Sequence, residues 1–274
     1  MSAISDNLIH FLARAHKDAP HKQLEVFRSI IENGLRTAQM QIKYPGGESL
    51  FNEVICFTDI PLRECFEHTA VYGKFGIGFR KSFVKNAGGN PARYFLDYMP
   101  GRLNTEQAME SRGALFLNQV YQFKFLERLH ALLGANEELE LHDGNGAMVF
   151  ANEELKQLAA AMLYCFSFDK EMGDLGRARD ETLEIDLYYK EREWRLVPSQ
   201  LDLVSGAIRR EAGGPHVFYP FRRADVNMVV VPNEELRLSV LDYFLSLRDG
   251  ADPRLREFGA DPPPVISYDE MHRW

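Results

Sequence analysis

Val54-Ile-Cys-Phe-Thr58, which runs into Asp59-Ile-Pro61, is the clearest strand signal in the chain. Its β-branched and aromatic residues predict a buried strand, and the Asp and Pro that follow predict a turn. Residues 62–72 carry apolar side chains at roughly helical spacing after Pro61, and proline is acceptable at a first helical position. Phe75-Gly-Ile-Gly-Phe79 then predicts another strand. A short helix between two strands indicates a domain that mixes both kinds of element.

Further strands and helices are spread along the rest of the chain. Apolar residues between Gln23 and Asn33 fall at helical spacing, and Asn33-Gly34 is typical of a helix end. Asn233 predicts the start of a late helix, because asparagine is a good N-terminal cap. Strands are expected at 8–12, 164–168, 191–197, 217–221 and 226–231.

The order of these elements favours an α+β fold. Strands and helices alternate without the regular rhythm of a doubly wound parallel sheet. We therefore predict one α+β domain over residues 1–250, with a helical insertion at about 103–162 and a C-terminal extension over 251–274. We also predict that the strands of His10, Phe57 and Trp194 lie in neighbouring mixed or antiparallel sheets that line one cleft.

The composition is that of a globular protein with an excess of acidic residues. The 274 residues are 45% hydrophobic and 26% charged, which excludes a disordered or coiled-coil chain. The net charge is −8, from 32 Lys and Arg against 40 Asp and Glu. This excess of acid opposes sequence-blind binding to DNA or to anionic membranes.

Neither secretion nor a membrane span is expected. The N-terminus lacks a basic start before an apolar run, and nowhere do about 18 apolar residues follow one another. We therefore expect a cytoplasmic protein. Cys56, Cys65 and Cys165 are odd in number and far apart in apolar neighbourhoods, so we predict reduced core thiols with neither a disulfide nor a metal site.

The candidate catalytic residues are Glu191 and Glu193. In a strand, Glu191, Glu193 and Arg195 share one face. Two carboxylates about 7 Å apart along a strand can divide labour, one holding a sugar hydroxyl or a developing cation and the other orienting an acceptor. The alternative is an edge strand whose charges form surface ion pairs.

Other polar residues have a structural interpretation and a functional one. His10 lies on a strand, where it is a satisfied core or rim residue or a donor to a ligand hydroxyl. Thr58 either faces a cleft or belongs to the cap of the segment after Pro61. Arg80 lies in a group of basic residues that suits either a phosphate-bearing ligand or a solvated strand edge.

Several segments resemble the AbiGi family of bacterial abortive-infection proteins. They match in order and spacing over roughly the first 200 residues. The matching segments are 24–35, 55–62, 68–79, 90–91 and 193–195. The resemblance implies a role in phage defence, where the family is described as the antitoxin half of a two-gene abortive-infection system.

The order of the parts is also similar to that of ADP-ribosyltransferases, and this second resemblance implies NAD as substrate and no metal. His10 would contact the NAD ribose, Thr58 or Tyr72 would support the nicotinamide side, and Arg80 belongs to the basic group that would hold the pyrophosphate. Glu193 would be the catalytic carboxylate and Glu191 its accessory. The chain departs from many transferases in having Phe57-Thr58-Asp59 in place of Ser-Thr-Ser, and in having Phe11 after His10.

Two hypotheses follow from these resemblances. In the first, the chain is an ADP-ribosyltransferase-like defence enzyme that uses NAD, with Glu193 as its catalytic carboxylate. In the second, it is a catalytically inactive antitoxin or sensor that binds a cognate toxin. The protein partner is an antitoxin under the first hypothesis and a toxin under the second. The sequence does not identify the acceptor of any ADP-ribose.

Overall fold

The computed structural model divides the chain into two compact units. The first unit is made of Met1–Met40, Glu53–Ala92 and Leu187–Trp274, and the second of Gln41–Asn52 and Arg93–Asp186. The structure describes residues 6–12, 14–16, 18–43, 49–95, 124–125, 128–129, 131, 141–142, 144–145, 148–150, 152–171, 192–214 and 216–271.

An open, mostly antiparallel sheet forms the centre of the fold. Its strand order is β15-β14-β5-β1-β4-β11-β6, with β3 paired to β4 beside this path. The strands are β1 (Asn7–Phe11), β3 (Ala38–Lys43), β4 (Ser49–Thr58), β5 (Gly76–Arg80), β6 (Asn90–Pro91), β11 (Glu193–Leu196), β14 (Val226–Val231) and β15 (Val265–Ser267). Only the pair β14 and β15 on this path is parallel. The α+β class predicted from the sequence is confirmed.

The expectation that the strands of His10, Phe57 and Trp194 belong to neighbouring sheets is wrong. His10, Phe57 and Trp194 lie on β1, β4 and β11, which are adjacent strands of a single sheet. A sequence pattern identifies a strand but not its partner, because pairing depends on residues far apart in the chain.

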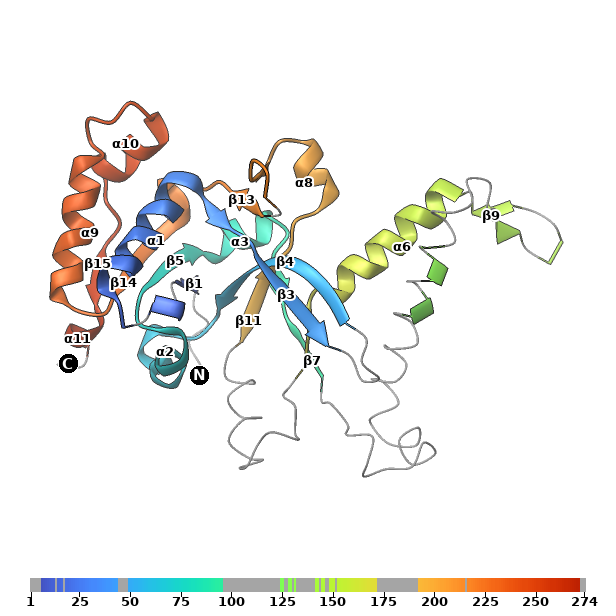
Figure 1. Cartoon of the computed structure of the whole chain (residues 1–274), viewed down its shortest axis with the longest axis horizontal. Coiled ribbons are helices and arrows are strands. Elements are labelled where there is room, and N and C mark those ends of the chain that lie inside the picture. Colours follow the sequence, from blue (N-terminus) through green and yellow to red (C-terminus); the bar gives the residue numbers. More distant parts are fainter. Residues whose placement is uncertain are drawn as a thin grey trace, which may run out of the picture. The chain divides into compact units, whose positions relative to one another are not determined.

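One face of the sheet is covered by three helices, α1 (Pro20–Asn33), α9 (Glu234–Ser246) and α10 (Pro253–Ala260). Figure 1 shows α1 and α9 side by side over the strands. Phe27 of α1 stacks on Phe75 with ring centroids 5.3 Å apart and meets Phe244 of α9 edge-on at 5.7 Å. Phe244 in turn stacks on Phe258 of α10. Aromatic burial of this kind is a large part of a domain's stabilisation.

The other face carries a shorter cover. After β4 the chain forms a 3-10 turn (Leu62–Glu64) and α2 (Phe66–Tyr72), as the apolar spacing predicted. Buried Ile9, Ile60 and Cys65 pack together here, with Phe11 against them. The short helices α3 (Lys81–Asn86), α8 (Gln200–Val204) and α11 (Tyr268–Met271) complete the α-helices described in this unit, which also has 3-10 turns at Arg14–His16 and Arg223–Asp225.

The described residues after 250 include a strand of the sheet. The sequence suggested an extension over 251–274, and the described residues there form α10, β15 and α11. Val230 of β14 pairs with Ile266 of β15, which makes β15 the edge strand. The last described residues are therefore part of the folded core of the first unit.

The second unit is described in shorter pieces. β7 (Arg93–Phe95) pairs in parallel with β10 (Asp169–Glu171), and β8 (Leu141–His142) pairs with β9 (Met148–Phe150). The helix α6 (Asn152–Phe166) lies within this unit. The strand expected at 164–168 is wrong, because α6 continues to Phe166 and a turn follows. Most of the expected helical insertion at 103–162 lies outside the described residues.

Candidate functional site

Thr58 and Glu193 lie side by side in the sheet. Thr58 of β4 pairs with Ile9 of β1 on one side and with Glu193 of β11 on the other. Residues directly opposite each other in neighbouring antiparallel strands point to the same face. The side chains of Thr58 and Glu193 therefore share the face on which α2 packs.

A polar contact joins Thr58 to α2. Thr58 Oγ1 is hydrogen bonded to His68 Nε2 at 3.0 Å, and both residues are buried. The His68 ring stacks on that of Tyr72, with centroids 4.3 Å apart, and it also lies 5.0 Å from the ring of Phe11. The structure thus brings Thr58 and Tyr72 together through His68. Sequence reasoning assigned no function to His68, although it lies one helical turn before Tyr72 and so on the same helix face.

The carboxylate of Glu193 is bound within its own strand. Arg195 Nε donates to Glu193 Oε1 at 2.7 Å, and the two residues are only 2% and 8% exposed. Because strand residues two apart share a face, the sequence placed Glu193 and Arg195 together, and the structure confirms that they meet. The pair is buried, and so is not the surface ion pair that the sequence analysis gave as the alternative for this strand. The charge of Glu193 is therefore already balanced by a guanidinium.

His10 lies on the opposite face of the sheet from Glu193. It follows Ile9 in β1, and successive strand residues point to opposite faces. Its ring lies 5.7 Å from that of Phe57, and its Nδ1 donates to the Cys56 carbonyl at 2.8 Å. Burial lowers the pKa of His10, and the hydrogen bond to that carbonyl partly offsets the effect. The structure does not bring His10 and Glu193 together.

Arg80 is also separated from Glu193, since β1 and β4 lie between β5 and β11 in the sheet. Arg80 is exposed at the end of β5, where its Nε donates to the Ala224 carbonyl at 2.7 Å. Its neighbour Lys81 pairs with Asp59 at 2.7 Å. Glu191 lies outside the described residues.

The three cysteines are all free. Cys65 is buried, and its thiol contacts the carbonyls of Ile60 and Pro61. Cys165 is exposed, so the expectation of a core thiol is wrong at this position, because α6 turns it outward. Within the described ranges, no three or more His, Cys, Asp or Glu side chains gather closely enough to hold a metal ion. In the same ranges, no helix is long and apolar enough to cross a membrane.

Thiol reactivity should separate the cysteines. Burial, with the nearby charge of Glu64, raises the pKa of Cys65 to about 12, so almost no thiolate forms there at pH 8. We expect Cys165 to react first with a chromogenic disulfide reagent, and Cys65 to react only after denaturation. The Cys165→Ser variant should lose the fast phase. Loss of that phase in Cys65→Ser would contradict the assignment.

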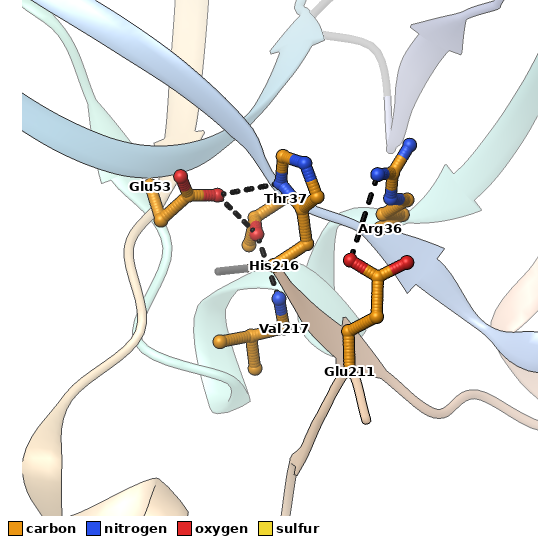
Figure 2. Close-up of polar contacts among 6 residues, drawn as sticks. All are labelled: Arg36, Thr37, Glu53, Glu211, His216 and Val217. Carbon is orange, nitrogen blue, oxygen red and sulfur yellow. Dashed lines mark hydrogen bonds and ion pairs between the residues drawn. The ribbon is translucent and has the colours of Figure 1, made fainter. Parts of the chain in front are cut away.

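A second polar cluster was not predicted from the sequence. Figure 2 shows Thr37 and His216 converging on Glu53. Thr37 Oγ1 donates to Glu53 Oε2 at 2.6 Å, and His216 Nδ1 lies 3.2 Å from the same oxygen. The backbone N–H of Val217 donates to Thr37 Oγ1 at 2.9 Å. Because the hydroxyl and the imidazole bind one carboxylate oxygen, the imidazole does not activate the hydroxyl, and the cluster lacks the geometry of a nucleophilic triad.

This cluster fastens a small sheet to β4. The sheet has the order β12 (Arg209–Arg210), β13 (Val217–Tyr219) and β2 (Leu35–Arg36). Exposed Arg36 and half-buried Glu211 also form an ion pair at 3.6 Å (Figure 2). We therefore interpret the cluster of Thr37, Glu53 and His216 as a structural one that holds the small sheet against β4.

Comparison with known proteins identifies a family. Residues 51–219 match the model of a family described as abortive phage resistance protein AbiGi, antitoxin. The chain belongs to the AbiGi family. The match includes β4, α2, β5 and β11 of the sheet, and with them Thr58, His68 and Glu193. Among curated proteins and among solved structures, nothing matches the chain. The likeness of this AbiGi protein to ADP-ribosyltransferases therefore stays a prediction.

Proposed function

We propose that this AbiGi protein is the antitoxin of a two-gene abortive-infection system and that it acts by binding its cognate toxin. The family description, which covers residues 51–219, carries the proposal. An antitoxin of this kind needs a stable surface for its partner and no catalytic group of its own.

The environment of Glu193 supports a binding protein over an enzyme. A glutamate that stabilises an oxocarbenium-like transition state must present its carboxylate to the substrate. Here the carboxylate is buried and bonded to Arg195. A buried ion pair of this kind can stabilise β11, which lies between β4 and β6 in the sheet.

An NAD-dependent transferase is the second candidate. The observation that favours it is the cross-strand pair of Thr58 and Glu193, with His68 and Tyr72 beside Thr58. The position of His10 on the other face of the sheet weakens it, because the ribose contact implied by the resemblance would lie away from Glu193. NAD consumption by the purified chain would support this candidate.

Growth assays with single genes test the proposal. The chain and the product of the gene encoded beside it are expressed separately and together from inducible promoters. We expect the neighbouring product alone to stop growth, the chain alone to be harmless, and the pair to grow and to copurify as a complex. Growth arrest by the chain alone, relieved by its neighbour, would exchange the two roles and rule out the antitoxin assignment.

A further inference from the structure

Helix α9 is apolar on two sides. Leu236, Val240 and Phe244 point into the core. On the outer side, Leu238 and Leu245 are each 51% exposed, with half-buried Leu241 between them. Spacings of three and four residues are those of the a and d positions of a heptad, which form the seam between packed helices. Within the described part of the chain, these outer leucines lack a covering element.

An acidic row runs along one flank of these leucines. Glu235 and Asp242 are exposed and seven residues apart, and exposed Asp249 follows seven residues later, just past the end of α9. A seven-residue repeat keeps side chains on one line beside the a and d positions. We call Leu238, Leu241 and Leu245, together with Glu235, Asp242 and Asp249, the α9 seam.

Charge decides which partner the α9 seam fits. Two copies paired antiparallel would place the acidic row against itself, which is repulsive. Two copies paired in parallel would place the acidic row against the opposite flank of the helix, which carries Arg237. The guanidinium of Arg237 is already bound by Glu234 at 2.6 and 2.5 Å. A helix with Lys or Arg along its flank complements the row in either direction. The net charge of −8 adds a long-range attraction for a basic partner.

We propose that the α9 seam binds an amphipathic helix of the cognate toxin, one with an apolar seam and a basic flank. The inference rests on the proposed antitoxin function and adds the chemistry of the partner. The α9 seam lies outside residues 51–219, so the family match does not assign this surface.

Two synthetic four-heptad peptides test the surface directly. Both carry leucine at the a and d positions, and their flanks carry either lysine or glutamate. In fluorescence anisotropy with the full chain, we expect the lysine peptide to bind at least about tenfold more tightly than the glutamate peptide at low salt. This preference should shrink at high salt, because exposed charges are screened.

Matched variants locate the binding. The double variant Leu238→Glu with Leu245→Glu should lower the affinity for the lysine peptide by at least about 30-fold, since each leucine loses its apolar contact with the peptide. Glu235→Lys with Asp242→Lys should reverse the preference between the peptides. Val204→Glu is the control, because Val204 is 78% exposed on α8, and it should bind as the unmodified chain does. Equal binding of the lysine peptide to the leucine variant and the unmodified chain would overturn the proposal.

The same variants with the purified toxin separate the two proposals. Toxin binding that is lost in the leucine variant and kept in Val204→Glu supports both. Equal toxin binding by all variants overturns the α9 seam and leaves the antitoxin function standing. Absence of any toxin binding overturns both. If sedimentation shows a dimer of the chain that Leu238→Glu and Leu245→Glu abolish, the occupant is a second copy and the toxin helix is excluded.

Discussion

Glu193→Gln is expected to lower the free energy of unfolding by about 3–5 kcal/mol, because it removes the charge of a carboxylate that is bonded to a buried guanidinium. The side chain of Arg195 is 2% exposed and that of Glu193 is 10% exposed, so water cannot replace the lost carboxylate. Equilibrium unfolding in urea measures the change. A glutamate aimed at a substrate would behave in the opposite way, since its removal leaves stability unchanged or slightly raised while activity falls.

The same Glu→Gln change at an exposed glutamate shows how much of the effect on stability comes from burial. Glu234→Gln also removes a carboxylate from an arginine, but on α9 the Glu234 side chain is exposed and that of Arg237 is only half-buried. Its urea midpoint should stay close to that of the unmodified chain. If Glu193→Gln unfolds at the same urea concentration as Glu234→Gln, the ion pair with Arg195 does not anchor β11.

Gly34→Ala should destabilise the first unit by about 2–5 kcal/mol, the sum of backbone strain and a steric clash. Gly34 ends α1 with φ 98° and ψ 176°, a conformation that is essentially restricted to glycine. A Cβ atom there would lie 2.5 Å from the Tyr219 carbonyl oxygen, which belongs to the backbone and has little room to move. Thermal and urea unfolding both report the loss.

Gly206→Ala is the control for the conformational part of this effect. Gly206 also has a positive φ, 72°, but a Cβ atom at this position meets nothing within 4 Å. It should cost about 1 kcal/mol, since only the left-handed backbone is penalised. Equal losses at Gly34 and Gly206 would show that contact with Tyr219 is unimportant.

Local signals explain the parts of the fold that were predictable. The apolar spacing before Asn33-Gly34 identified α1, and the β-branched residues around Phe57 identified β4. At 164–168 the same reasoning failed, because a short apolar run suits a strand or the end of a helix equally well. The edge position of β15 was not predictable, since its pairing with β14 depends on the whole sheet being assembled.

The candidate site was predictable only where its contacts are local. Glu193 and Arg195 are two residues apart in one strand, so their shared face followed from the sequence. The hydrogen bond between Thr58 and His68 depends on how α2 folds back over the sheet, and residue spacing alone does not predict that arrangement. The separation of His10 from Glu193 is decided by strand register, and a shift of one residue would have reversed it.

Strands that pair in the first unit lie far apart in the sequence, and this delays formation of the complete sheet during synthesis. Its sheet joins β5 to β14, and about 145 residues lie between Arg80 and Val226. At roughly 5–20 residues per second, a ribosome needs on the order of 7–30 s to make that interval. During this time β5 lacks one of its two neighbours, and α9 has not yet been synthesised. The sheet is therefore complete only after β14 and β15 have been made. Under the proposed antitoxin function, this delay favours synthesis of the chain ahead of its toxin.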